Sequence, residues 1–219
     1  MHAITLPMFN EEPPAGTREA VAPGAWVLRG FALDAAERLL TGIKRIATAS
    51  PFRHLVTPGG QGMSVAMTNC GNVGWFSDRR GYRYTEVDPE TSRPWPAMPV
   101  LFMQLASDAA HEAGFDNYAP DVCLINRYEV GTRLTLHQDH DERDRRAPIV
   151  SVSLGLPATF LFGGFARKEP QQRVPLVHGD VVVWGGPSRM RYHGVLPLKV
   201  GEHPLTSARR YNLTFRVAR

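Results

Sequence analysis

The second half of the chain consists almost entirely of short strand candidates, and this limits the possible fold more than any other feature. Short runs rich in Val, Ile, Leu, Thr and Phe are separated by Gly, Pro and Asp, which are turn signals. Such a series predicts a mainly β protein with flanking helices, built around a double-sheet jelly roll. The expected strands are residues 121–128, 133–139, 149–155, 158–163, 172–177, 180–185, 190–195 and 210–217.

The last of these strands alternates polar and apolar residues without a break. Alternate residues of a strand point to opposite faces, so one face is apolar and the other is polar. If the polar face were exposed, its arginines would need no partner, as in an ordinary antiparallel sheet. If it lines the interior, the guanidinium groups need an anion, and a bidentate carboxylate ligand would satisfy them. The polar face consists of Arg210, Asn212, Thr214 and Arg216.

A His-x-Asp pair, His137 and Asp139, falls in the strand candidate at residues 133–139, where both side chains should share one face. A hydrogen-bonded surface pair is the alternative, because short motifs often occur by chance. A third His downstream would complete the two-His-one-carboxylate set of non-haem Fe(II) oxygenases, which leaves coordination positions open. We favour His193, which directly follows a buried strand candidate, over His178 and His203, which lie in turn or loop signals.

Two further polar residues can help to hold a small dianion. Asn126 and Tyr128 share one face of the strand candidate at residues 121–128. Both side chains can donate hydrogen bonds to a carboxylate.

The first half predicts two helices, which we expect to cover the outer face of one sheet. The first spans residues 34–48, with Asp34 as N-cap and Glu37 closing a capping box. The second spans residues 98–112 and ends before Gly114.

Residues 75–84 interleave aromatic residues with arginines, and they follow a Pro- and Glu-rich start, residues 1–22, that we expect to be a loose arm. Bases stack on aromatic faces and Arg pairs with phosphates, so the segment suits contact with nucleic acid. An ordinary hairpin with its aromatic face packed on the core is the alternative.

The composition agrees with a cytoplasmic globular enzyme. The 219 residues carry a formal net charge of +4, which permits a polyanionic partner without requiring one. Cys70 and Cys123 have no metal-ligand spacing, and we expect buried free thiols in a reducing compartment. The sequence contains neither a signal-peptide pattern nor a run of membrane-spanning length. We therefore expect no membrane association, and we predict no obligate protein partner.

Six long stretches carry a family resemblance that extends from about Pro23 to Val217. They are SPFRHLVTPGGQGMSVAMTNCG, DPETSRPWPAMP, CLINRYEVGTRLTLHQDHDE, RAPIVSVSLGLPATFLFGG, HGDVVVWGGPSR and RYNLTFR. At these stretches the chain resembles the AlkB family of bacterial Fe(II)/2-oxoglutarate-dependent dioxygenases, which remove alkyl groups from damaged nucleic-acid bases.

The resemblance implies a double-stranded β-helix core with an N-terminal nucleotide-recognition lid, and it implies Fe(II), with 2-oxoglutarate and O₂ as co-substrates. The residues that it implies as iron ligands, and so as catalytic residues, are His137, Asp139 and His193. The residues that it implies for 2-oxoglutarate are Asn126, Tyr128, Arg210, Asn212 and Arg216. The residues that it implies for the substrate are Trp75, Tyr82, Arg83, Tyr84, Asp141 and Arg167.

We therefore predict oxidative dealkylation of N-alkylated bases, such as 1-methyladenine and 3-methylcytosine, in alkylated DNA, with RNA as a further candidate. The reaction would convert 2-oxoglutarate into succinate and release formaldehyde. One alternative is a 2-oxoglutarate-dependent hydroxylase of a protein or small molecule, which would not need the aromatic–arginine segment. Another is a non-catalytic cupin-like metal-binding module, against which the complete ligand set argues.

Three residues depart from the family pattern. Gln61 stands where the family has an aromatic residue, and Arg133 and His140 stand where it has lysines. All three fall in the nucleic-acid-facing part, so they bear on affinity and not on the iron chemistry. Within one compact unit, we expect residues 1–118 to hold the helices and the lid, and residues 119–219 to hold the dioxygenase core.

Overall fold

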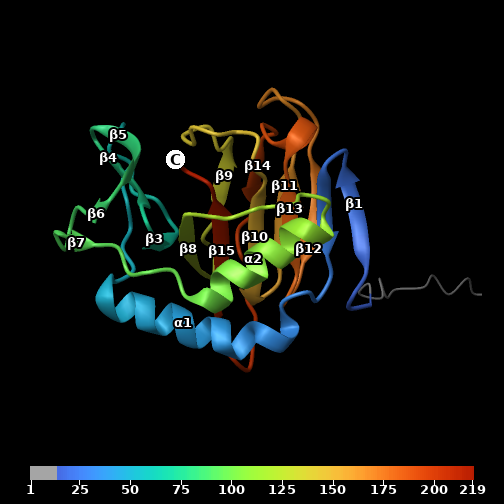
Figure 1. The fold of residues 1–219 in the computed structure, drawn as a ribbon, viewed down its shortest axis with the longest axis horizontal. Coiled ribbons are helices and arrows are strands. Elements are labelled where there is room, and N and C mark those ends of the chain that lie inside the picture. The colour runs from blue at the N-terminus through green and yellow to red at the C-terminus, as the bar shows by residue number, and fades with distance from the viewer. Residues whose placement is uncertain (1–13) are drawn as a thin grey trace, which may run out of the picture.

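Two packed β-sheets form the centre of the molecule, and two helices lie against the outer face of the larger sheet (Figure 1). The computed structural model describes residues 14–219, so the first 13 residues of the predicted arm lie outside the described residues. The larger sheet has seven strands in the order β1-β2-β13-β10-β15-β8-β3, and the smaller has four in the order β12-β11-β14-β9. This arrangement confirms the predicted jelly roll.

All eight strands expected in the second half of the chain are present, and the chain passes back and forth between the two sheets. Those in the larger sheet are β8 (Val122–Glu129), β10 (Ile149–Gly155), β13 (Val181–Trp184) and β15 (Arg209–Arg216). Those in the smaller sheet are β9 (Leu134–His137), β11 (Ala158–Phe162), β12 (Gln172–Leu176) and β14 (His193–Val195).

Three strands from the first half extend the larger sheet. They are β1 (Arg18–Ala22), β2 (Ala25–Leu28) and β3 (Ala66–Gly71). The prediction of a loose arm as far as residue 22 is therefore wrong for β1, which pairs antiparallel with β2. The Arg18 guanidinium lies 3.8 Å from the centroid of the Trp26 ring, and this cation–π contact helps to hold the edge strand in place.

Both predicted helices form, but the first begins differently from the prediction. A 3₁₀ turn, η1 (Leu33–Ala35), leads into α1 (Ala36–Ala49), whose N-cap, Ala35, makes no side-chain hydrogen bond. Asp34 lies inside this turn, so its backbone cannot take the extended conformation of an N-cap, and the predicted capping box is wrong. The second helix, α2 (Val100–Glu112), ends before Gly114, which has a φ of +86°.

The apolar core has two layers, one on each face of the larger sheet. On the outer face, both helices pack against side chains of the central strands, and Phe102 meets Phe215 edge to face at 6.2 Å. Cys70 and Cys123 lie directly opposite each other on β3 and β8, both buried and free, as predicted. The inner layer fills the space between the two sheets.

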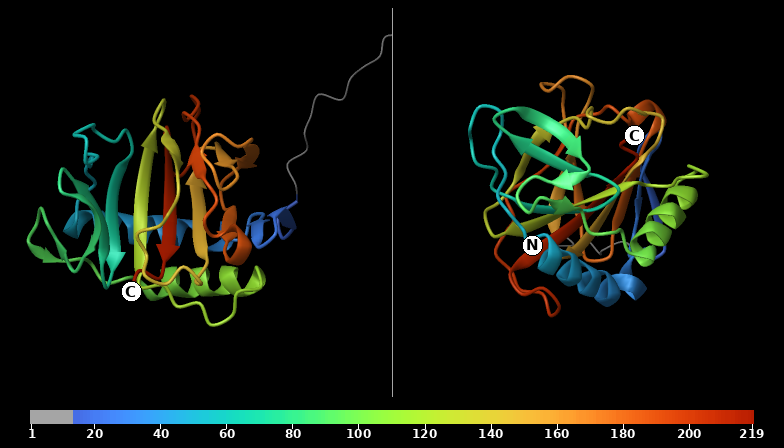
Figure 2. Two further views of the ribbon diagram at one scale, coloured as in Figure 1. Left: turned by 90° about the horizontal axis from the view of Figure 1, so that it is seen from above. Right: turned by 60° about the vertical axis from the view of Figure 1, so that its left-hand side comes forward.

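Two small hairpins stand beside the sheets (Figure 2). One pairs β4 (Gly74–Asp78) with β5 (Gly81–Thr85), and the other pairs β6 (Val87–Asp88) with β7 (Arg93–Pro94). The β4–β5 hairpin is the predicted aromatic–arginine segment, and its pairing determines which side chains share a face.

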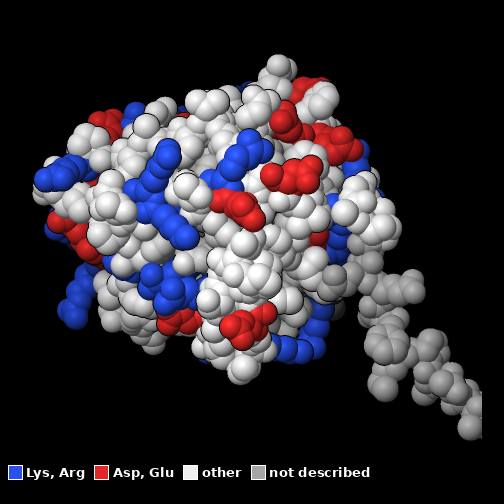
Figure 3. Space-filling view, turned by 90° about the horizontal axis from the view of Figure 1, so that it is seen from below, with Lys and Arg blue, Asp and Glu red and all other residues white. Residues whose placement is uncertain are grey.

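No helix within residues 14–219 is long and apolar enough to span a bilayer. The face of the molecule that carries α1 shows basic and acidic groups side by side, and neither sign covers it continuously (Figure 3). The net positive charge of the chain is therefore not gathered into a single patch on this face.

Gly155 ends β10 with a φ of +94°, packed against the chain that leads into β15. An added Cβ would overlap the Thr206 hydroxyl and the Arg209 carbonyl oxygen. We expect Gly155→Ala to lower the free energy of unfolding by at least about 1–3 kcal/mol through overpacking. Urea unfolding measures this loss of stability, with Gly62→Ala as the control variant, because an added Cβ at Gly62 meets nothing within 4 Å. Equal stability of the two variants would contradict this account.

Candidate active site

Three side chains that could hold a metal ion converge between the two sheets. His137 ends β9 and pairs with His193, the first residue of β14. One ligand atom from each of His137, Asp139 and His193 lies within 4.8 Å of the others. His137 Nε2 is 3.7 Å from Asp139 Oδ1, and His193 Nε2 is 3.6 Å from Asp139 Oδ2. The predicted pair and the predicted third His thus meet at one point.

The chain leaves the smaller sheet before it reaches Asp139. The expected strand at residues 133–139 ends at His137, so its predicted end is wrong, and Asp141 does not lie on a continued strand. The Asp139 carbonyl oxygen instead accepts a hydrogen bond of 2.7 Å from the Arg189 guanidinium, and Gln138 donates to a backbone carbonyl oxygen before β14. These side-chain hydrogen bonds replace the backbone pairing of a strand. The irregular segment after β9 therefore still directs Asp139 toward both histidines.

Charge and burial leave Asp139 and His137 in the forms that a divalent cation needs. Burial alone would raise the pKa of Asp139, but Arg216 and the two histidines outweigh it and hold that pKa well below its usual range. Burial and the neighbouring His193 lower the pKa of His137 to about 4. At neutral pH the site therefore presents an ionised carboxylate and a neutral His137 imidazole, as metal binding requires.

The polar face of β15 lines the interior, which excludes the exposed alternative. The exposed fractions of Arg210, Asn212, Thr214 and Arg216 are 1%, 5%, 6% and 5%. The apolar face packs toward the helices, as the alternation predicts.

Arg210 lies buried with few partners. It donates one hydrogen bond of 3.0 Å to the Ser153 hydroxyl, and its guanidinium lies 4.9 Å from the centroid of the Tyr128 ring. Burial lowers the pKa of Arg210, and the neighbouring Tyr128 offsets this only in part. Arg210 Nε and Nη1, Arg216 Nη1 and Asn126 Oδ1 are all buried without a hydrogen-bond partner among residues 14–219.

These unpartnered atoms have the chemistry that a small dicarboxylate would satisfy. A buried guanidinium without an anion is costly, and a carboxylate can bind its planar fork through two hydrogen bonds. Asn126 and Asn212 already contact each other at 3.3 Å, and Asn212 also donates to the Ser151 hydroxyl at 2.8 Å. Asn212 therefore helps to hold β15 to its neighbours β8 and β10. Arg210 has more unused donors for a ligand, at Nε and Nη1.

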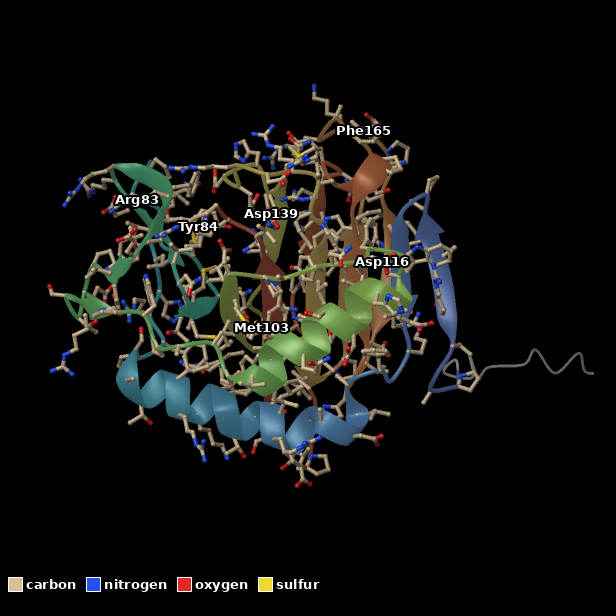
Figure 4. All side chains as sticks on the ribbon, viewed as in Figure 1. Arg83, Tyr84, Met103, Asp116, Asp139 and Phe165 are labelled. Carbon is tan, nitrogen blue, oxygen red and sulfur yellow. The ribbon has the colours of Figure 1, made fainter. Side chains whose placement is uncertain are left out.

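The β4–β5 hairpin brings its aromatic face close to the three candidate metal ligands. Figure 4 shows Tyr84 on the hairpin side of Asp139. Trp75 and Tyr82 stack with their ring centroids 5.6 Å apart, and Trp75 Nε1 donates a hydrogen bond of 2.8 Å to Asp141. Four of the six residues predicted to contact the substrate are thus gathered here: Trp75, Tyr82, Tyr84 and Asp141.

The other two lie apart from this group. Arg83 is on the opposite face of the hairpin, where two hydrogen bonds of 2.8 Å join it to Asp78. Arg167 lies in the β11–β12 loop, where it donates to the Leu136 carbonyl oxygen and packs over Tyr192. Their contacts with the substrate stay predictions. Residues Gln61, Arg133 and His140, which depart from the family pattern, are all exposed.

Two buried charged residues at the site were missed by sequence reasoning. Glu142 accepts a hydrogen bond from the Tyr84 hydroxyl and one of 2.9 Å from Arg189, and it lies 3.4 Å from Arg216. Glu142 is 5% exposed and Arg189 is 2% exposed. Together they link the hairpin to the loop that carries Asp139. The only signal in the sequence was the position of Glu142 close to the His-x-Asp pair, and position alone does not predict burial.

Comparison with known proteins decides the family. A profile of the 2OG-Fe(II) oxygenase superfamily matches residues 24–216. Alpha-ketoglutarate-dependent dioxygenase AlkB of Escherichia coli is 58% identical over 213 residues, which cover 97% of this chain and 98% of that protein. This chain belongs to the AlkB family of 2OG-Fe(II) oxygenases. The protein is thus an Fe(II)/2-oxoglutarate-dependent dioxygenase, and the prediction of these cofactors is confirmed.

More distant relatives share the fold. The DNA N(6)-methyladenine demethylase ALKBH1D of Arabidopsis thaliana is 34% identical over 173 residues, which cover 67% of this chain and 38% of the relative. A solved structure of OsALKBH1 superposes with a TM-score of 0.81 at 28% identity, covering 92% of this chain and all of that one. The non-catalytic alternative is therefore excluded for this AlkB-family chain.

Removing individual metal ligands should separate metal binding from folding. We expect His137→Ala to lose most of its affinity for Mn(II), a probe of the iron site, with little change in the stability of the metal-free protein. Asp139→Ala should lose the metal as well, and it should also cost about 1.5–3 kcal/mol because it removes the charged acceptor of two buried hydrogen bonds from Arg216. Calorimetric titration and urea unfolding of the metal-free variants measure the two effects. Metal loss in the control His178→Ala would mean that the third ligand is wrong.

Arg210→Ala should separate co-substrate binding from folding. Losing a buried charge-assisted interaction costs roughly 2–5 kcal/mol, so we expect a strong rise in the 2-oxoglutarate requirement. Without 2-oxoglutarate, the variant should be at least as stable as the wild type, because Arg210 is buried with only one side-chain hydrogen bond. Thermal unfolding with and without 2-oxoglutarate, together with the KM for 2-oxoglutarate, measures both. An unchanged KM would show that the co-substrate binds elsewhere.

Proposed function

We propose that this dioxygenase removes alkyl groups from N-alkylated bases, such as 1-methyladenine and 3-methylcytosine, in DNA and as a second substrate in RNA. The observation that carries the proposal is the β4–β5 hairpin, whose stacked aromatic pair, hydrogen-bonded to the Asp141 carboxylate, lies beside the three candidate metal ligands. Support also comes from the relatives, one of which is a DNA N(6)-methyladenine demethylase by name.

In this proposal, His137, Asp139 and His193 bind Fe(II), and Arg210 and Arg216 hold 2-oxoglutarate. Bound iron supplies the oxidation of the alkyl carbon by O₂, coupled to the conversion of 2-oxoglutarate into succinate and CO₂. Arg216 donates two hydrogen bonds, of 2.8 and 3.0 Å, to Asp139 Oδ2, which keeps that carboxylate ionised and fixes its orientation. Its free Nη1 remains available to the co-substrate.

The hairpin supplies base recognition. Trp75 offers an indole whose N–H already orients the Asp141 carboxylate. A base methylated at a ring nitrogen that normally pairs is cationic, and a nearby carboxylate stabilises the charged form. Such a base also pairs poorly, so it leaves the duplex at a lower cost than an undamaged one. The hydroxylated methyl group then leaves as formaldehyde and restores the base.

Trp75→Ala tests this role. We expect it to impair formaldehyde release from a methylated oligonucleotide by the loss of one stacking contact, worth about 1–3 kcal/mol. Succinate formation without nucleic acid should change far less, because the Trp75 side chain hydrogen-bonds to Asp141 and not to His137, Asp139 or Arg210. Trp75→Phe keeps an aromatic face and should recover most of the loss. A fall in coupled and uncoupled turnover to the same degree would mean that Trp75 is a core residue.

The same assay separates the proposal from its main rival. A hydroxylase of a protein or small molecule would form succinate but release no formaldehyde from any methylated oligonucleotide. Binding of the oligonucleotide should also weaken with salt, since phosphate contacts release counterions.

A further inference from the structure

A second group of aromatic and arginine side chains borders the iron site on the side away from the hairpin. This group, the Phe165 cluster, consists of Phe165 and Arg167 in the β11–β12 loop and of Arg191 and Tyr192 before β14. In Figure 4, Asp139 lies between Tyr84 of the hairpin and Phe165. The two groups thus flank the metal ligands from opposite sides.

Phe165 is exposed and yet held in place. It is 53% exposed, which exceeds even the 44% of Tyr82 on the hairpin. The Arg191 guanidinium lies 4.9 Å from the centroid of the Phe165 ring and donates a hydrogen bond of 2.9 Å to the Gly163 carbonyl oxygen. A cation–π contact of this kind orients an aromatic ring without burying it.

The cluster is tied to both strands that carry histidine ligands. Arg167 donates to the carbonyl oxygen of Leu136, the residue before His137. Tyr192 precedes His193, and its backbone exchanges hydrogen bonds of 2.7 and 2.9 Å with the two glycines that open the β11–β12 loop. The position of Phe165 is therefore linked to the metal ligands by short, hydrogen-bonded connections.

The arginines of the cluster keep their charge available. Within residues 14–219, neither Arg167 nor Arg191 forms an ion pair with an acidic side chain, whereas Arg83 of the hairpin is neutralised by Asp78. A single exposed apolar side chain is common and needs no explanation. An exposed aromatic ring with one unpaired arginine over its face and a second two residues along the loop instead has the composition of a stacking platform for a single strand.

We propose that Phe165 stacks on a nucleobase adjacent to the flipped one, while Arg191 contacts a phosphate of the same strand, next to Arg167, which the family resemblance already assigns to the substrate. This inference rests on the proposed function and adds a second base subsite to it. The protein then holds the substrate strand at two points, with the lesion between the hairpin and the Phe165 cluster. A methylated mononucleoside reaches only the first of these points, so the second contributes only to longer substrates.

The test compares wild type, Phe165→Ala and Phe165→Tyr on three probes. They are a single-stranded oligonucleotide with one 1-methyladenine, the same strand with abasic sites flanking the lesion, and the methylated nucleoside. Fluorescence anisotropy gives the Kd of the labelled strands, and formaldehyde release gives KM for all three. Val100→Ala, at a 76% exposed position of α2 on the helical side, is the matched control.

We expect Phe165→Ala to raise the Kd for the intact strand by about 5- to 150-fold, the range of one stacked base. Phe165→Tyr and Val100→Ala should stay near wild type, and the nucleoside KM should not change. With the abasic strand, the wild type should bind more weakly than with the intact strand. Phe165→Ala should show the same Kd for both strands, since the abasic sites and the substitution remove the same contact.

If Phe165→Ala and the abasic sites weaken binding independently and additively, or if Phe165→Ala leaves the Kd unchanged, the second subsite is overturned. The proposed function still stands in that case, provided that the wild type demethylates the strand. The absence of formaldehyde from every probe with wild type overturns the proposed function, and the second subsite with it.

Discussion

The pairing of Arg216 with Asp139 is the contact on which the rest of the site depends. It joins the last strand of the larger sheet to the turn that leaves the smaller one, so it holds the two layers in register at the metal position. Asp139 keeps its charge because this guanidinium and the two histidines together outweigh the effect of burial on its pKa. Arg216 also lies 3.4 Å from Glu142, which accepts a hydrogen bond from the Tyr84 hydroxyl of the hairpin. The metal-ligand candidate Asp139, the polar face of β15 and the hairpin therefore meet at a single cation.

The parts of the site that lie on regular strands could be predicted because strand periodicity is local. The alternation of β15 identified its polar face, and the choice of His193 over His178 and His203 followed from its place beside a buried strand. The structure places His178 and His203 together, 4.4 Å apart between ring centroids, away from the metal ligands. The start of α1 and the edge strand β1 escaped prediction because each depends on contacts made only in the folded chain.

The buried charges could not be predicted for the same reason. Burial of Glu142 depends on the path of an irregular loop, and Arg189 reaches it from 47 residues away. The pairing of Arg83 with Asp78 depends on the register of the hairpin, which places the two on the face opposite Trp75. A strand pattern indicates which residues share a face, but it does not indicate which face of a free-standing hairpin turns toward a distant site.

The two ligand histidines show one more consequence of local geometry. Each donates its Nδ1 hydrogen to a carbonyl oxygen two residues earlier, of Thr135 for His137 and of Arg191 for His193. These bonds fix the tautomer and aim both Nε2 lone pairs inward before any ion arrives. The intrinsic affinities of first-row divalent metals for such a ligand set follow a common order, in which iron is not the strongest binder. Geometry, ligand type and the supply of metal, rather than affinity alone, therefore decide which ion such a prearranged ligand set holds.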